Sequence, residues 1–162
     1  MSLPDLIVFD LDFTLWACGG TYCDCLTPPF RCDQGRVLDA QQRHVELYPD
    51  VPEIMEECDR MGIRMGLASR TEEPEWARQL TDLLKITDRF AGTEIYPGSK
   101  LQHFSALQTS QDVLFSQMLF FDDEQRNIRE VGQLGVTTVF VPDGLNDALF
   151  RAALSRFAGP AT

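Results

Sequence analysis

The sequence predicts an α/β fold in which helices flank a mostly parallel central sheet. Segments with strand character alternate with helical segments along the chain, and this alternation is typical of right-handed βαβ units. Two strand segments, near 5–10 and 117–121, are nearly continuous apolar runs, as expected for strands that are covered on both faces. We therefore expect these two strands at the centre of the sheet.

The expected strands are short apolar segments separated by helical segments and turns. They lie near 5–10, 63–68, 92–95, 117–121 and 136–141. Gly135 stands between the fourth helix and the fifth strand, where a glycine is typical of a turn.

The expected helices alternate with the strands from position 50 onward. They lie near 50–61, 74–85, 99–109, 124–134 and 146–157. Pro52 and Pro74 each stand in the first turn of a helix, where proline is favoured. The second helix carries an apolar stripe at helical spacing, which predicts packing on the core. That stripe consists of Trp76, Leu80, Leu83 and Leu84.

The segment 17–48 lacks this regularity. It contains the turn-forming pairs Gly19-Gly20 and Pro28-Pro29, followed by Gly35. Because structureless loops of this length are uncommon in compact domains, we expect either a small hairpin flap or a mobile cover over the site beside it.

Length and charge limit the class of protein. A chain of 162 residues is expected to fold as one domain, 1–162, with a substantial core. Its 25 acidic and 14 basic residues give a net charge of −11, which argues against binding to nucleic acid or to an anionic membrane. No run approaches the ~20 apolar residues of a membrane span, and no basic and apolar leader is recognised. We expect a cytoplasmic protein, by default a monomer.

Four of the five cysteines fall within the irregular segment, with the spacing C-x4-C-x-C-x6-C. They are Cys18, Cys23, Cys25 and Cys32. Four thiolates can close a tetrahedral zinc site, but the C-x-x-C pairs of common zinc ribbons are absent. Free thiols in a reducing compartment are the simpler interpretation, and a structural zinc is the alternative.

Asp10 and Asp12 directly follow the first strand. Asp is common where a chain leaves a sheet, so a turn is the simple interpretation of such a pair. Other polar groups follow other apolar segments, and they are Ser69, Lys100 and the pair Asp122-Asp123. Since the carboxyl ends of parallel strands share one edge of a sheet, where ligands bind, the sequence predicts a functional site there.

Four segments together resemble the haloacid dehalogenase (HAD) superfamily of aspartate-nucleophile phosphatases, and more narrowly its magnesium-dependent phosphatase-1 family. They are Asp10-Leu-Asp-Phe-Thr-Leu-Trp16, Ala68-Ser-Arg-Thr71, Glu94-Ile-Tyr-Pro-Gly-Ser-Lys100 and Phe120-Phe-Asp-Asp-Glu-Gln-Arg-Asn-Ile128. The resemblance covers nearly the whole chain. It implies a Rossmann-like sheet of strand order 5-4-1-2-3 and a phosphomonoesterase that needs Mg²⁺.

The resemblance makes Asp10 the nucleophile and Asp12 the general acid and base. An ionised carboxylate can form an acyl phosphate, which divides one hydrolysis into two displacements. Asp12 would protonate the departing alkoxide or phenoxide and then take a proton from the attacking water.

An acidic protein that binds phosphate needs local positive charge, and Mg²⁺ prefers hard oxygen ligands while keeping several waters. Asp10, the backbone carbonyl of Asp12 and one of the pair Asp122-Asp123 would hold it. The resemblance favours Asp123 as the direct ligand, with Asp122 holding a metal-bound water. A helix N-cap is the alternative role for either member of the pair.

Phosphate binding is assigned to the remaining motif residues. Ser69 would hydrogen-bond a phosphate oxygen, and Lys100 would neutralise charge shared by the nucleophile and the phosphate. Arg70 has a planar fork suited to phosphate or carboxylate, although it could equally reach solvent. Thr14 would fix the loop through its hydroxyl, and Trp16 is expected in the core or as an aromatic wall.

Only a helix and a strand fit between Ser69 and Lys100, so the cap domain of many relatives is expected to be missing and the pocket to be open. The resemblance suggests phosphotyrosine-like substrates and sugar phosphates. A receiver-like phospho-aspartate signalling domain is the alternative function, although there the acidic pair follows the first strand and the phosphorylated aspartate a later one. A catalytically silent adaptor is disfavoured because no catalytic residue type is missing.

Overall fold

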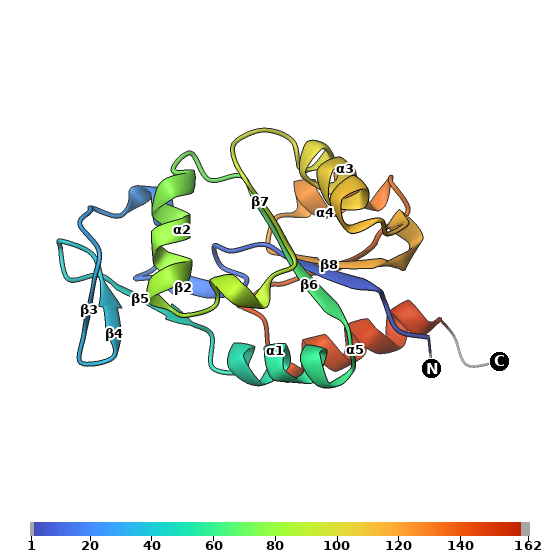
Figure 1. Ribbon diagram of the computed structural model, residues 1–162, viewed down its shortest axis with the longest axis horizontal. Coiled ribbons are helices and arrows are strands. Elements are labelled where there is room, and N and C mark those ends of the chain that lie inside the picture. Colours follow the sequence, from blue (N-terminus) through green and yellow to red (C-terminus); the bar gives the residue numbers. More distant parts are fainter. Residues whose placement is uncertain (1, 160–162) are drawn as a thin grey trace.

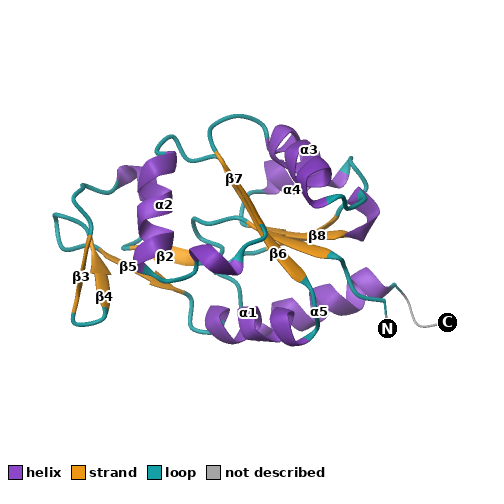
Figure 2. Cartoon of the chain, viewed as in Figure 1, coloured by secondary structure: helices purple, strands orange, loops and turns teal. Residues whose placement is uncertain are grey.

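The computed structural model describes residues 2–159, which are drawn in Figures 1 and 2. Five parallel strands form the central sheet in the order β7-β6-β1-β8-β9. Their bounds are β1 Leu6–Phe9, β6 Arg64–Ser69, β7 Gly92–Ile95, β8 Met118–Asp122 and β9 Thr137–Phe140. Counted among these five strands, the order is 5-4-1-2-3, so the expected fold class is confirmed. In the register, Phe9 of β1 lies opposite Phe121 of β8.

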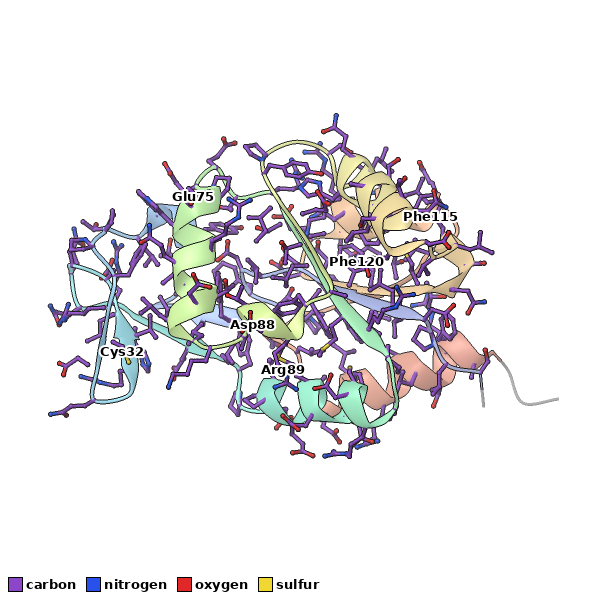
Figure 3. All side chains as sticks on the ribbon, viewed as in Figure 1. Cys32, Glu75, Asp88, Arg89, Phe115 and Phe120 are labelled. Atoms are coloured by element: carbon purple, nitrogen blue, oxygen red, sulfur yellow. The ribbon has the colours of Figure 1, made fainter. Side chains whose placement is uncertain are left out.

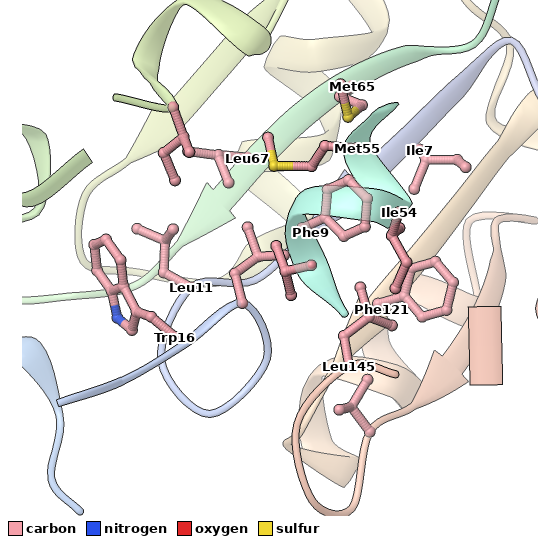
Figure 4. Close-up of a cluster of buried hydrophobic side chains, with 14 of the residues drawn as sticks. Ile7, Phe9, Leu11, Trp16, Ile54, Met55, Met65, Leu67, Phe121 and Leu145 are labelled. Carbon is pink, nitrogen blue, oxygen red and sulfur yellow. The ribbon is translucent and has the colours of Figure 1, made fainter. Parts of the chain in front are cut away.

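The central strands are buried on both faces, which explains their continuous apolar sequence. Ile7 and Phe9 point into one hydrophobic cluster, whereas Leu6 and Val8 point into the cluster on the other face. Figure 4 shows the first cluster, in which Phe9 and Phe121 lie near Ile54. The sheet therefore holds the ends of β1 and β8 in fixed positions.

Five helices cover the sheet. They are α1 Val51–Arg60, α2 Pro74–Leu83, α3 Lys100–Gln111, α4 Gln125–Gly132 and α5 Asp147–Ala158. Helices α1 and α5 lie on one face and α3 and α4 on the other, while α2 stands between the sheet and the segment after β1 (Figure 1). Within residues 2–159, no helix has the length and apolar character needed to cross a membrane.

The apolar stripe of α2 is buried only in part. Leu80 lies fully in the core, but Trp76 is half-buried and meets the ring of Phe30 edge-on at 6.0 Å between ring centroids. Leu83 and Leu84 pack at the margin of the cluster. This partial burial arises because α2 packs against both the sheet and the irregular segment, and neither covers it completely.

The irregular segment forms a small antiparallel sheet, which we call the flap (residues 16–47). Its strands are β2 Trp16–Cys18, β3 Arg31–Asp33, β4 Arg36–Leu38 and β5 His44–Leu47, in the order β2-β5-β4-β3. A short 3₁₀ turn, η1 Cys23–Cys25, joins β2 to β3. Val37 and Val45 of the flap belong to the same hydrophobic cluster as Phe9. The segment thus has regular β-structure that packs on the core of the domain.

A buried carboxylate holds the outer flap together. Asp39 is fully buried and accepts hydrogen bonds from the backbone N–H groups of Thr27 (2.9 Å), Gln41 (3.0 Å) and Arg43 (2.8 Å). It also accepts one from the Arg43 Nε (2.8 Å). Burial alone would raise the pKa of Asp39, but these donors outweigh it and the pKa is lowered.

We expect Asp39→Ala to lower the free energy of unfolding by about 3 kcal/mol at neutral pH, because three backbone donors and one guanidinium lose their acceptor. A lowered pKa means that the ionised carboxylate contributes stability above the unfolded-state pKa, which is about 4, and that this contribution is lost as the pH falls through the folded-state pKa. The difference between wild type and Asp39→Ala should therefore shrink in acid. Urea unfolding at several pH values measures it.

Asp33→Ala is the matched control, because Asp33 is an exposed acid on β3 of the same flap. It should change the free energy of unfolding by less than about 0.5 kcal/mol. Equal costs for the two variants would contradict the assignment of Asp39.

Candidate active site

The predicted polar residues converge at the carboxyl edge of the sheet. Asp10 and Asp12 follow β1, Ser69 ends β6, and Asp122 ends β8. Because β1 lies between β6 and β8, these strand ends are neighbours. A pocket of about 290 Å³ opens over them. It is lined by Asp10, Asp12, Tyr22, Asp24, Ser69, Arg70, Thr71, Lys100, Asp123, Glu124, Arg126 and Asn127.

Lys100 begins α3 and extends its ammonium group beneath the pocket. Its side chain is 1% exposed, and Nζ donates to Asp10 Oδ1 at 2.9 Å and to Asp122 Oδ2 at 2.6 Å. The centroid of the Phe120 ring lies 5.1 Å from Nζ. Burial alone would lower the pKa of Lys100, but the two carboxylates outweigh it and the pKa is raised. The ammonium is therefore a fixed positive charge between two strand ends.

Asp122 accepts three hydrogen bonds. Its Oδ2 accepts from Lys100 and from Asn127 Nδ2 (3.0 Å), and its Oδ1 accepts the backbone N–H of Glu124 (2.8 Å). The N-cap residue of α4 is Glu124, so neither member of the acidic pair occupies the N-cap position, although Asp122 accepts the N–H of that residue. These contacts orient Asp122 toward Lys100.

Asp123 is the open member of the acidic pair. It lines the pocket, is half-buried, and carries a carboxylate oxygen within 4.8 Å of ligand atoms from Asp10 and Asp122. Burial, together with the hydrogen bond and negative charge of Asp10, raises the pKa of Asp123 to about 9. The carboxylates of Asp10, Asp122 and Asp123 thus have one ammonium group between them. A divalent cation that prefers hard oxygen ligands would fit this excess of negative charge.

The hydroxyl groups of Thr14 and Ser69 differ in their position relative to the pocket. The Thr14 hydroxyl is fully buried and donates to Asp10 Oδ2 at 3.4 Å, outside the pocket lining, so it fixes the loop and does not face a ligand. Ser69 Oγ lines the pocket and accepts the Thr71 N–H at 3.3 Å. This leaves the Ser69 hydroxyl proton available for a ligand.

Arg70 lies at the pocket wall and does not simply reach solvent. Its Nη1 donates to Asn127 Oδ1 at 3.2 Å, and Glu124 lies at 4.0 Å. Its Nε is buried without a hydrogen-bond partner among the described residues. Asn127 therefore joins Arg70 to Asp122 through its two amide atoms.

Asp12 is held by the flap. Trp16 Nε1 donates to Asp12 Oδ1 at 2.8 Å, and the backbone N–H of Cys23 donates to the same oxygen at 2.9 Å. The loop turns sharply between Asp12 and Trp16, and Phe13 lies in the left-handed region at φ 61°. This turn brings Trp16 back beside Asp12. Burial raises the pKa of Asp12, although the two N–H donors oppose it.

The flap cysteines do not gather into a metal site. Cys18 and Cys23 are buried near Asp12, whereas Cys25 and Cys32 are exposed. Figure 3 shows Cys32 on the outer part of the flap. Among the described residues, the one cluster of metal-ligating side chains is Asp10, Asp122 and Asp123. Burial raises the thiol pKa of both buried cysteines, which is typical of unreactive thiols.

His103 is a structural residue of the site that the sequence did not reveal. It lies one turn after Lys100 on α3, is fully buried, and stacks on Tyr96. Its Nε2 lies 3.0 Å from the Ser69 carbonyl and 2.8 Å from that of Tyr96, and Nδ1 lies 3.0 Å from the Ser99 carbonyl. The imidazole thus ties the end of β6 to the start of α3. In the sequence, this bracing role is indicated only by the position of His103 one helical turn after Lys100.

Two pocket residues from the flap were also missed. Tyr22 and Asp24 line the pocket from η1 and the residue before it. Asp24 Oδ2 accepts the Glu72 N–H at 3.3 Å, and Cys23 Sγ donates to Thr71 Oγ1 at 3.4 Å. These contacts dock the flap against the loop after β6. No local pattern in the flap sequence predicts them.

Comparison with known proteins extends the similarity beyond the motifs. The sequence profile of the Acid Phosphatase family matches residues 2–159. Human magnesium-dependent phosphatase 1 is 45% identical over 158 residues, with 96% of this chain and 88% of the human protein aligned. A HAD-like hydrolase superfamily protein of Schizosaccharomyces pombe is 33% identical over 147 residues, which cover 85% of each chain.

The fold has counterparts among solved structures. The crystal structure of a HAD-superfamily hydrolase from Ehrlichia chaffeensis aligns with a TM-score of 0.69, over 98% of both chains, at 12% sequence identity. At this low identity the likeness concerns the fold, and it includes the whole of the central sheet and its helices.

We expect Lys100→Met to lower the free energy of unfolding by about 3–5 kcal/mol in metal-free buffer, because two buried carboxylates lose their common cation. The sequence contains one other lysine, Lys85, which is exposed at the end of α2, so Lys85→Met is a matched control with little expected effect. Chemical denaturation of the two variants in EDTA provides the comparison. Similar stabilities would show that Lys100 is not held as the structure indicates.

Proposed function

The chain belongs to the acid phosphatase family within the HAD hydrolase superfamily, as a homologue of magnesium-dependent phosphatase 1, and on this premise we propose that it hydrolyses phosphate monoesters through an aspartyl phosphate on Asp10. It is a magnesium-dependent phosphatase, as the sequence resemblance predicted. The observation that carries the mechanism is the placement of Asp10, between the Lys100 ammonium and the open carboxylate of Asp123, on the floor of the pocket.

In the first step, a carboxylate oxygen of Asp10 attacks phosphorus and the bond between phosphorus and the ester oxygen breaks. Lys100 holds Asp10 Oδ1 at 2.9 Å, so the nucleophile is fixed before the substrate arrives. Asp12 gives its proton to the departing ester oxygen, which leaves as an alcohol or a phenol.

In the second step, Asp12 takes a proton from water as the water oxygen attacks the phosphorus of the aspartyl phosphate. The bond between Asp10 and phosphorus breaks, inorganic phosphate leaves, and both carboxyl groups return to their starting protonation states. Asp12 can serve first as acid and then as base because the departing ester oxygen and the attacking water occupy the same position beside it.

The pocket residues divide the remaining work. Asp10, Asp123 and the backbone carbonyl of Asp12 would hold Mg²⁺, which supplies positive charge that neutralises the phosphate and the nucleophile. Asp122, which accepts three hydrogen bonds, would fix Lys100 and hold a metal-bound water. The hydroxyl of Ser69 and the guanidinium of Arg70 are the donors for phosphate oxygens.

The substrate is a phosphorylated compound, and we assign it to phosphotyrosine-like esters or sugar phosphates. Between Ser69 and Lys100 the chain forms only α2, the 3₁₀ turn η2 Thr87–Arg89 and β7, so no cap domain closes the pocket. The flap places Tyr22 and Asp24 at one wall, beside the leaving group's path. A phosphate on a bulky group can therefore enter.

A receiver-like domain is the second candidate. Family membership favours hydrolysis, because the matched relatives are named as phosphatases or hydrolases. The position of Asp12 also favours hydrolysis, since a receiver requires no acid and base beside its phosphorylated aspartate.

We expect hydrolysis of p-nitrophenyl phosphate in Mg²⁺, and loss of activity to the background level in EDTA or in Asp10→Asn. Asp123→Asn should raise the Mg²⁺ concentration that gives half the maximal rate, because one anionic ligand becomes neutral. Asp88→Asn is the control, since Asp88 is exposed on η2 and outside the pocket (Figure 3). Full activity in EDTA, or in Asp10→Asn, would exclude the mechanism.

Asp12→Ala should lower kcat by about 10²–10⁴-fold, the usual contribution of a general acid and base. Its phosphorylated form should accumulate, because water attacks slowly without the base. Mass spectrometry of acid-quenched Asp12→Ala after mixing with p-nitrophenyl phosphate should find added phosphate on Asp10. Failure to find it on a millisecond-to-minute timescale would remove Asp12 from the second step.

A further inference from the structure

The two oxygens of Asp12 have different surroundings. Oδ1 accepts the Trp16 Nε1–H at 2.8 Å and the Cys23 N–H at 2.9 Å, and the Cys18 thiol lies at 3.8 Å from the same oxygen. Within residues 2–159, no group donates a hydrogen bond to Oδ2, although Asp12 lines the pocket. The donors around Oδ1 leave no space or acceptor lone pair for a proton there.

The Trp16 indole cannot easily turn away from this contact. Its ring is fully buried, and Trp16 is the first residue of β2, paired with Leu47 of β5. Figure 4 shows the ring beside Leu11, at the margin of the cluster that contains Phe9 and Phe121. A buried indole N–H needs an acceptor, and Asp12 Oδ1 provides one at 2.8 Å.

We propose that Trp16 and the Cys23 N–H are positioning groups that reserve Asp12 Oδ1 as an acceptor, so that Oδ2 alone carries the proton to the leaving group and from the water. This inference rests on the proposed function of Asp12. It assigns the flap a second task besides forming a pocket wall, because both donors come from flap residues.

Loss of a positioning group should change the rates for esters with poor and good leaving groups to different extents. If Asp12 loses one donor, its carboxyl group can rotate and offer the wrong oxygen, so proton transfer to the leaving group weakens. A poor leaving group depends on this proton more than a good one does. Phenyl phosphate and p-nitrophenyl phosphate are suitable probes, since they have similar shapes but phenol is a much weaker acid than p-nitrophenol.

The first test is Trp16→Phe, which keeps an aromatic ring and removes the N–H. We expect kcat/KM to fall about ten times further for phenyl phosphate than for p-nitrophenyl phosphate. Trp76→Phe is the matched control, because Trp76 is the only other tryptophan and packs on Phe30 at a distance from Asp12. Its ratio of kcat/KM for the two esters should equal that of wild type.

The second test leaves the Trp16 ring in place and compares two substitutions of the buried Cys23. Cys23 is the first residue of η1, where proline is tolerated, and the residue before it has an extended backbone with ψ 153°. Cys23→Pro removes the N–H that Asp12 accepts, and Cys23→Ala removes the same thiol but keeps that N–H. We expect the ratio of kcat/KM for the two esters to shift further in Cys23→Pro than in Cys23→Ala. This comparison decides the matter if Trp16→Phe does not fold.

The outcomes separate this inference from the proposed function. Asp12→Ala should show the same unequal loss for the two esters. If Asp12→Ala shows it while Trp16→Phe and Cys23→Pro lower both esters equally, the positioning role is wrong and the function of Asp12 stands. If Asp12→Ala lowers both esters equally, both the acid role and the inference fail.

Discussion

The Lys100 ammonium is the interaction on which the site depends. It is buried between Asp10 and Asp122, and so it joins the ends of β1 and β8 while supplying one positive charge to three neighbouring carboxylates. The sheet order makes the contact possible, because β1 and β8 are adjacent and their carboxyl ends meet below α3. One ammonium does not balance three carboxylates, and a divalent cation beside Asp10 and Asp123 would supply the remaining positive charge.

The central sheet and the flap each hold a different part of the candidate active site. Strand ends fix Asp10 and the pair Asp122-Asp123, whereas Asp12 takes its orientation from Trp16 and Cys23 in the flap. The flap in turn depends on the buried Asp39, which joins its outer turns, and on the contacts that dock η1 to the loop after β6. Contacts in the outer flap are thereby connected to the orientation of the Asp12 side chain.

The sequence predicted the strands of the sheet and nearly all helix boundaries, because periodic apolar residues report burial directly, and the family resemblance implied the strand order. It also identified the site residues that follow strand ends, such as Ser69 and Lys100. It did not reveal that Trp16 serves Asp12 or that His103 braces the loop before Lys100, because both depend on the directions of side chains after folding. The flap was less predictable still, since its strands are short and Asp39 resembles any turn aspartate until its four donors are seen.

Because Lys100 is buried, the two lysine side chains differ in their accessibility to reagents. Of the two lysine side chains in the sequence, solvent meets only that of Lys85, since Lys100 is shielded and engaged by carboxylates. Reagents that couple to primary amines will therefore modify the Lys85 side chain and spare the one in the pocket. A dye, a cross-linker or a solid support can be attached through Lys85 without altering the side chains that line the pocket.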